Sequence, residues 1–267
     1  MRYVHNQTVK GASHADAGGE CQDASLSWKD EDMAMIIVSD GHGGERHKNS
    51  AIGAKLSCQI TMSHLREFCN NVGNEWLIHN PKNTIRRLCI SILAEWIHEI
   101  SCIQDADDIV SYGCTLIAYV QTKHFWLALQ IGDGRCVVLN KANEWSQPIP
   151  WDDRCMLNMT TSLCDEDAVN EFRFAYGDAE SIPEAVFLCS DGVDGTFGSG
   201  DLLYGFYANI MKSVCDDGIE KVAAAPAAIG AFSENAENFG KSLIFVALGE
   251  GVAIYGLLIS ILIINTL

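Results

Sequence analysis

The sequence predicts an α+β fold in which antiparallel sheets are covered by helices. Short apolar segments rich in β-branched residues recur along the chain. Two long segments with helical spacing come after the first of these strands, and the other strands follow. Nearly half of the 267 residues are hydrophobic, so a large core can form. We therefore expect one globular domain over residues 1–249 and a hydrophobic tail of uncertain role over residues 250–267.

Each expected element has a local signal. The first strand is an apolar run ending at Ser39-Asp40-Gly41, and the segment after it is read as a helix. The next helix has one apolar face at helical spacing. Asp133-Gly134, between two later strands, predicts a hairpin turn. The expected strands are residues 33–38, 115–120, 125–131, 136–139, 185–189 and 242–248, and the expected helices are residues 49–68 and 83–102.

Charge and cysteine content narrow the functional classes. The net charge of −17 repels nucleic-acid backbones, so no nucleic-acid partner is expected. The 11 cysteines are scattered, form no C-x-x-C pair, and follow an N-terminus without an apolar leader. A reducing cytoplasm is therefore the expected location, with most cysteines acting as small apolar core residues.

The C-terminal end leaves alternatives open. Residues 251–267 carry no charge. That run is shorter than the roughly 20 residues that a membrane-spanning helix needs, and extending it back to Leu243 includes Glu250. A tail anchor, a buried terminal element and a disturbed reading frame are all compatible with it. A membrane partner is expected only if the tail is an anchor.

A strand followed by Asp-Gly occurs three times, at Asp40, Asp133 and Asp191. A strand is a rigid mount for a carboxylate, and the glycine lets the backbone turn and leaves its carbonyl accessible. Several such ends at one rim would form an oxygen-rich site for Mg²⁺ or Mn²⁺. Such ions activate water and stabilise charge on a phosphoryl group. The alternative is ordinary turn chemistry, which explains Asp133 best because of its expected hairpin.

His42 stands out within Asp40-Gly41-His42-Gly43-Gly44, which has more glycine than a turn needs. The ordinary pKa of a histidine lies near neutrality, so His42 is a candidate general acid for a leaving alkoxide. A loop histidine without a catalytic role is the simpler interpretation. Residues 151–154 are read either as a flap facing the site or as a solvated acidic loop.

Four motifs in order resemble a known family. They are Asp40-Gly41-His42-Gly43-Gly44, Tyr112-Gly113-Cys114-Thr115, Gly132-Asp133-Gly134-Arg135 and Ser190-Asp191-Gly192. Their order and spacing resemble the metal-dependent serine/threonine protein phosphatases of type 2C. Gly11-Ala12-Ser13-His14 with Cys21-Gln22-Asp23-Ala24 is similar to the bacterial branch. Each motif alone is weak, but the ordered set is specific and covers about residues 8–200.

The resemblance implies a central β-sandwich flanked by helices on both sides (α-β-β-α) and a binuclear Mg²⁺ or Mn²⁺ site. It implies hydrolysis of phosphoserine and phosphothreonine on proteins, in signalling by dephosphorylation. The partners would be a phosphoprotein substrate and a cognate kinase system, and we expect a monomer. The implied roles are Asp40 bridging both metals, Gly41 ligating through its carbonyl, Asp191 ligating one metal, Asp133 helping to bind a third and weaker ion, Asp23 orienting metal-bound water, His42 as acid and His14 near the phosphate.

Two departures from the family pattern leave activity open. Gln22 stands where the family often has Glu. The family's last metal ligand is an Asp before the final strand, where this chain has Glu237-Asn238-Phe239. Either Glu237 or Asn238 substitutes, or one metal site is weakened. The alternative to an active enzyme is therefore a pseudophosphatase that serves as a regulatory binding module.

Overall fold

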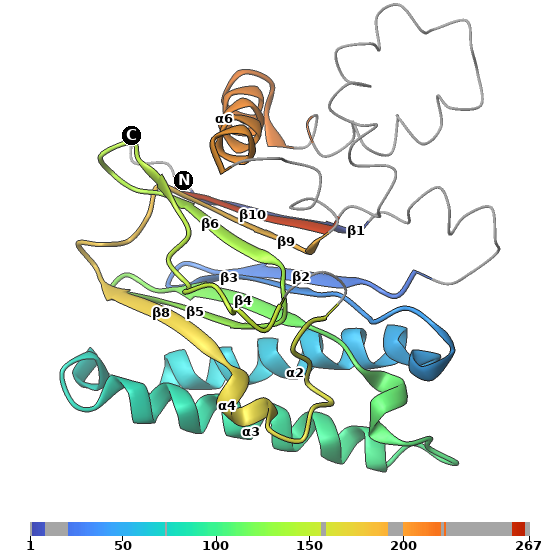
Figure 1. Cartoon of the computed structure of the whole chain (residues 1–267). Helices are drawn as coiled ribbons and strands as arrows, with labels where there is room; N and C mark the ends of the chain where they lie inside the picture. Colours follow the sequence, from blue (N-terminus) through green and yellow to red (C-terminus); the bar gives the residue numbers. More distant parts are fainter. Residues whose placement is uncertain are drawn as a thin grey trace, which may run out of the picture.

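Two five-stranded antiparallel sheets stack face to face, with helices on their outer sides (Figure 1). This computed structural model describes residues 2–8, 21–72, 74–155, 159–191, 200–219, 222 and 258–264. The predicted α+β class and the α-β-β-α sandwich are confirmed.

The lower sheet of Figure 1 has the strand order β2-β3-β4-β5-β8, and the upper sheet has the order β1-β10-β9-β6-β7. The lower strands are β2 (Ala24–Lys29), β3 (Ala34–Ser39), β4 (Leu116–Gln121), β5 (Phe125–Ile131) and β8 (Arg173–Asp178). The upper strands are β1 (Arg2–Thr8), β10 (Leu258–Ile264), β9 (Ala185–Cys189), β6 (Arg135–Leu139) and β7 (Trp145–Ser146).

Helices cover the lower sheet from below and the upper sheet from above (Figure 1). The helices are α2 (Ser50–Asn71), α3 (Pro81–Ser101), α4 (Ala168–Glu171) and α6 (Gly200–Asp217), with short 3₁₀ turns η1 (Glu45–His47), η2 (Asn74–Leu77) and η3 (Ile109–Tyr112). The indole Nε1 of Trp96 in α3 donates to the Gly53 carbonyl of α2 at 2.9 Å, which ties the two long helices together.

Strand β3 shows why a continuous apolar run was a reliable strand signal. Met35 and Ile37 pack into the core between the lower sheet and the helices, while Ile36 and Val38 pack into the core between the sheets. Both faces of this strand are covered, so every residue in it is buried. A third core, with Phe206 and Tyr207 of α6, lies against the outer face of the upper sheet.

Most expected elements are present with small shifts in their ends. The expected strands 125–131 and 185–189 match β5 and β9 at both ends. The expected strand 242–248 lies outside the described residues. The sequence-based prediction missed β1, β2, β7, β8, α4 and α6, and it included β10 only as one alternative, a buried terminal element.

The predicted Asp133-Gly134 hairpin is wrong. Strand β5 pairs with β4 and β8 in the lower sheet, whereas β6 pairs with β7 and β9 in the upper sheet. The connection around Asp133 therefore crosses from one sheet to the other. A two-residue hairpin would have paired β5 with β6, so simple hairpin chemistry does not explain this aspartate.

Part of the hydrophobic tail is a central strand of the upper sheet. Strand β10 pairs with β1 on one side and with β9 on the other, both antiparallel. The expected boundary after residue 249 therefore separates β10 from the other strands of its own sheet. Within the described ranges, no helix is both long enough and apolar enough to cross a membrane.

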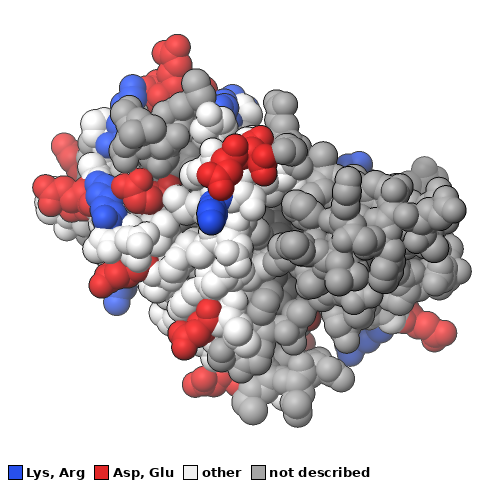
Figure 2. Space-filling view, turned by 90° about the horizontal axis from the view of Figure 1, so that it is seen from above, with Lys and Arg blue, Asp and Glu red and all other residues white. Residues whose placement is uncertain are grey.

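The surface is acidic, as the net charge of −17 requires. In the view from above, acidic side chains are more widespread than basic ones on the described part of that face (Figure 2). Such a surface disfavours polyanionic partners.

Candidate active site

The ends of five strands meet at one end of the sandwich. Val38 near the end of β3 pairs with Ile117, and Leu116 at the start of β4 pairs with Ile131 at the end of β5. In the upper sheet, Cys189 at the end of β9 pairs with Arg135 at the start of β6. The three predicted aspartates directly follow or link these ends, so the two sheets deliver them to one rim.

Backbone and hydroxyl contacts hold Asp40 at this rim. The Asp40 N–H donates to Thr115 Oγ1 at 3.1 Å, and the Thr115 N–H donates to the Asp40 carbonyl at 2.8 Å. The hydroxyl of Ser39 donates to the Thr115 carbonyl at 2.6 Å. The motif around Thr115 is therefore a structural brace for the carboxylate.

Gly41 lets a second segment approach Asp40. A Cβ at position 41 would lie 2.4 Å from the Gln22 carbonyl oxygen, so only glycine fits here. Gln22 Nε2 donates to the carbonyl of His42 at 3.2 Å and to Ser50 Oγ at 2.7 Å. A glutamate at position 22 would have no amide donor for the His42 carbonyl, so the departure at Gln22 has a structural reason.

The loop carrying Asp133 is tightly packed against the segment carrying Asp191. A Cβ at Gly134 would lie 2.4 Å from the Cys189 carbonyl oxygen. Gln130 Nε2 donates to the carbonyls of Gly132 and Gly134 at 3.1 and 2.6 Å. This crossing between the sheets therefore fixes the Asp133 backbone close to the end of β9.

Two carboxyl groups converge on that of Asp40. Its carboxyl group hydrogen-bonds with those of Asp23 and Asp191. Burial, followed by the charges of these two neighbours, raises the pKa of Asp40 well above its usual range. The structure thus brings together Asp40, Asp23 and Asp191.

The donor set fits a hard divalent cation, since it consists of carboxylate and carbonyl oxygens. The carboxyl groups of Asp40, Asp23 and Asp191 lie close enough together to share a proton. Among the described residues, no group of three or more His, Cys, Asp or Glu side chains is arranged to hold a metal ion as it stands. Three carboxyls in hydrogen-bond contact need either a proton or a cation between them.

His42 lies beside this cluster, but its ring forms its hydrogen bond with a residue outside the cluster. Its Nε2 is 2.7 Å from Ser162 Oγ. Burial, and then the nearby His47, lower the pKa of His42 to about 4, although Asp165 and Asp191 act in the opposite direction. The neutral-range pKa that suggested an acid role from sequence is therefore not the pKa of this side chain in the folded chain.

Residues 151–154 are exposed except for Asp152, so this segment is a solvated loop with one buried carboxylate. Asp152 is only 6% exposed and accepts from Arg154 Nε and Nη2, both at 2.9 Å. Arg154 Nη1 also donates to Glu171 Oε1 at 3.0 Å. Burial and the neighbouring Asp165 raise the pKa of Glu171 to about 7.

Several predicted residues lie outside the described part of the chain. They are His14, Glu237 and Asn238. Sequence reasoning in turn missed Ser162, Thr161 and Glu171. The segment that contains Thr161 and Ser162 has no hydrophobic period, and its contacts with His42, Cys114 and Gly132 join residues far apart in the sequence.

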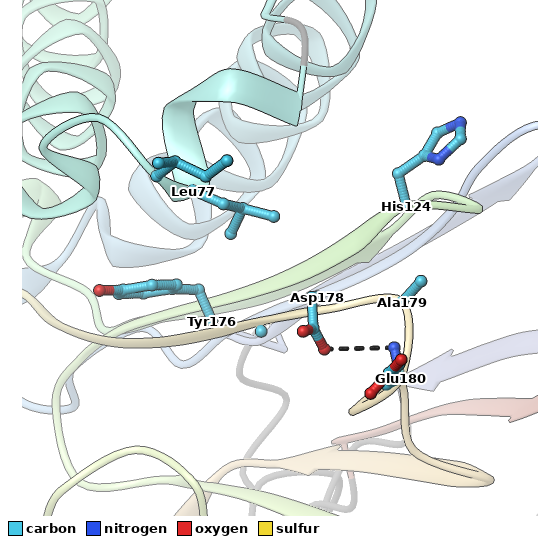
Figure 3. A pocket seen from close by; sticks show the side chains of 8 residues that line it. Leu77, His124, Tyr176, Asp178, Ala179 and Glu180 are labelled. Atoms are coloured by element: carbon cyan, nitrogen blue, oxygen red, sulfur yellow. Dashed lines mark hydrogen bonds between the residues drawn. The ribbon is translucent and has the colours of Figure 1, made fainter.

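A separate pocket of about 600 Å³ lies at the opposite end of the sandwich. Figure 3 shows Tyr176 and Asp178 of β8 facing Leu77 across it, with Glu180 in the turn that follows. Asp178 accepts from the backbone N–H of Glu180 at 3.2 Å, so this carboxylate is engaged in its own turn. The pocket shares no residue with the aspartate cluster.

Comparison with known proteins identifies two separate similarities. The protein phosphatase 2C family model matches residues 10–225, and the family model of the ATP synthase C subunit matches residues 218–263. Serine/threonine-protein phosphatase 3 of Escherichia coli is 27% identical over 175 residues, covering 63% of this chain and 65% of that protein. The K subunit of the A-type ATP synthase of Sulfolobus acidocaldarius is 54% identical over 39 residues, 15% of this chain and 39% of that protein. The chain thus spans less than two thirds of the length of these relatives.

Solved structures share the fold. A serine/threonine phosphatase from Staphylococcus aureus is 15% identical with a TM-score of 0.61, covering 100% of this chain and 96% of that one. The catalytic domain of the phosphatase PstP, solved with two manganese ions, is 15% identical with a TM-score of 0.55, covering 100% of this chain and 98% of that one.

Proposed function

Because this chain belongs to the protein phosphatase 2C family, we propose that it hydrolyses phosphoserine and phosphothreonine on proteins with a metal-activated water. The observation that supports this most directly is the convergence of Asp23 and Asp191 on the buried Asp40 at the sandwich rim. Buried carboxyls with strongly perturbed pKa values in mutual contact are typical of catalytic or metal sites.

The proposed metal ligands are those whose backbone the fold fixes at the rim. Asp40, the Gly41 carbonyl and Asp191 would hold two Mg²⁺ or Mn²⁺ ions, with Asp23 orienting water. Asp133 would contribute to a third, weaker ion. Glu237, or Asn238 beside it, is proposed as the remaining ligand. When bound, such ions lower the pKa of water and offset charge on the phosphoryl group.

The chain's own residues position the reacting groups. Thr115 and Ser39 fix the direction of Asp40, and Gly41 allows the segment bearing Asp23 to reach it. His42 is proposed to donate a proton to the leaving serine or threonine oxygen as the P–O bond breaks. His14 is proposed to contact the phosphate.

Phosphate release by the purified full chain tests this function. With millimolar Mn²⁺, we expect turnover of a phosphoserine peptide and of 4-nitrophenyl phosphate. Asp40→Asn should lower kcat by about two orders of magnitude, because charge stabilisation at the reacting phosphoryl is lost. Asp178→Asn, which changes an exposed carboxylate at the other end of the sandwich, is the matched control. No release by the wild-type chain, or equal rates for Asp40→Asn, would refute the proposal.

A pseudophosphatase is the second candidate. It is favoured by the end of the phosphatase match at residue 225, before the segment in which the last ligand is expected. Calorimetry with Mn²⁺ discriminates: absence of binding at millimolar metal supports the regulatory module, and binding with turnover excludes it.

The cellular setting is proposed from composition. We propose a cytoplasmic monomer that opposes a cognate kinase system in a bacterial signalling pathway. Residues 251–267 carry no charge, and the ATP synthase match extends to residue 263, so a membrane-associated form is the alternative. Flotation of the full chain with lipid vesicles, compared with a chain ending at residue 249, separates the two.

A further inference from the structure

Ser162 is buried against the His42 ring. The serine is only 2% exposed, and its Oγ lies 2.7 Å from His42 Nε2. The two residues are 120 positions apart in the sequence, so the contact exists only in the folded chain. A buried hydroxyl at this distance forms a hydrogen bond that determines how the ring is oriented.

The other contacts of Ser162 restrict what its hydroxyl can do. Its Oγ lies 3.2 Å from the Cys114 carbonyl oxygen and accepts from the Cys164 N–H at 3.4 Å. Its own N–H donates to Asp165 Oδ2 at 2.8 Å. A hydroxyl has one proton to donate. If that proton goes to the Cys114 carbonyl, Oγ is left to accept the N–H of His42 Nε2.

Two further neighbours, Gly113 and His47, restrict the position of the His42 ring. A Cβ at Gly113 would lie 2.8 Å from His42 Cδ2, so this edge of the ring rests on Gly113. His47 packs edge-on at a centroid distance of 5.1 Å and is itself held by the Val110 carbonyl. Cδ2 and Nε2 are bonded neighbours in imidazole. They therefore face Gly113 and Ser162, and Nδ1 lies on the opposite edge.

We propose that Ser162 is a positioning residue for His42. Its hydroxyl accepts from Nε2 while donating to the Cys114 carbonyl. The ring is thereby held in one orientation and one tautomer, with its Nε2–H directed at Ser162 and Nδ1 on the edge away from it. This rests on the proposed function, in which His42 serves the leaving oxygen. The segment of residues 159–165 also contacts the loop of Asp133, where the Gly132 N–H donates to Thr161 Oγ1 at 3.0 Å.

The kinetic test uses two leaving groups in the Mn²⁺-loaded full chain. A phosphoserine peptide releases a poor leaving group that needs a proton, whereas 4-nitrophenyl phosphate releases a stable anion. Ser162→Ala should lower kcat about tenfold for the peptide and less than about twofold for the aryl ester. In a His42→Ala background, Ser162→Ala should have no further effect. Ser57→Ala, which removes a buried hydroxyl bonded within α2, is the matched control.

A second readout needs neither metal nor turnover. Nitrogen-15 NMR of the histidine rings in the metal-free full chain should show His42, assigned by its loss in His42→Ala, as the Nε2–H tautomer. Ser162→Ala should give a mixture of tautomers. Equal kinetic losses for both esters, additive losses in the double variant, or an unchanged tautomer would overturn the inference while the phosphatase function stands. Wild-type protein that hydrolyses neither ester overturns both.

Discussion

Asp40 combines a structural cost with a proposed functional role. Its carboxyl is buried and lies next to Asp23 and Asp191, so its charged form is disfavoured in the metal-free chain. Without a bound cation, the negative charges of these three carboxyls therefore repel one another. Residues of this kind are retained for chemistry rather than for stability.

Replacing Asp40 by asparagine should therefore stabilise the metal-free protein. A carboxyl with a raised pKa contributes stability at low pH and loses it as the pH rises through its folded value. The Asp40→Asn variant should have a melting temperature in EDTA about 3 °C above wild type, with the gain larger at higher pH. Thermal melts across pH test this, with Asp178→Asn as the control. A variant less stable than wild type at every pH would contradict it.

Glu171 should produce a measurable pH dependence of its own. Its pKa is raised to about 7 by burial and by Asp165, so its stabilising contribution is present below its ordinary pKa of 4.5 and lost as pH rises through about 7. Glu171→Gln keeps an oxygen acceptor for Arg154 and removes the titration. Relative to wild type, the free energy of unfolding of the variant should rise by about 1–2 kcal/mol as the pH increases from 5 to 8, a value reduced for solvent screening.

Denaturant titrations at several pH values measure this gain. Glu166→Gln is the matched control, because Glu166 is an exposed glutamate on the same segment. A constant difference between Glu171→Gln and wild type across this range would show that Glu171 titrates normally.

The connection between the two sheets is the element that brings the aspartates together. Residues 132–134 link β5 of the lower sheet to β6 of the upper sheet. Gly134 lies against the Cys189 carbonyl, so a side chain there must push β9 away. The distance between Asp133 and Asp191 thus depends on a glycine.

Gly134→Ala should weaken both folding and metal binding. The new Cβ would lie 2.4 Å from a backbone oxygen that cannot move independently. We expect a loss of about 2 kcal/mol in unfolding free energy and weaker Mn²⁺ affinity by calorimetry. Gly205→Ala in α6, where nothing lies within 4 Å of the new Cβ, should be neutral or stabilising by up to about 1 kcal/mol. Similar effects of the two substitutions would contradict this account.

Strands covered on both faces and the two long helices were predictable from sequence, whereas the edge strands were not. Strands β5 and β9 are buried at every residue and read as uninterrupted apolar runs. Strand β2 alternates polar and apolar residues at a sheet edge, and β1 reads as RYVHNQT, so neither formed such a run. The Asp-Gly repeats located the carboxylates because the signal is local. Ser162 was not predictable, because its role depends on a contact across 120 positions.

At the scale of the whole molecule, the upper sheet depends on a strand from the far end of the chain. β10 lies between β1 and β9, so it joins the N-terminal strand to the rest of the sheet. Most of the same residues fall within the match to the ATP synthase family, which ends at residue 263. A strand paired on both sides is not free to insert into a bilayer at the same time. If residues 258–264 form this strand, a substitution that disrupts β10 should destabilise the protein. If they insert into a bilayer, the same substitution should leave the stability of the rest unchanged.

Proline at Ile261 distinguishes them. Ile261 pairs with His5 on one side and with Phe187 on the other. Proline removes a backbone N–H from a strand that has a partner on each side, which costs roughly 3 kcal/mol or more. We expect Ile261→Pro to lower the melting temperature by about 8 °C. Ile261→Val keeps the N–H and should be nearly neutral. An unchanged melting temperature for the proline variant, together with flotation of the wild-type chain on vesicles, would place residues 258–264 outside the sheet.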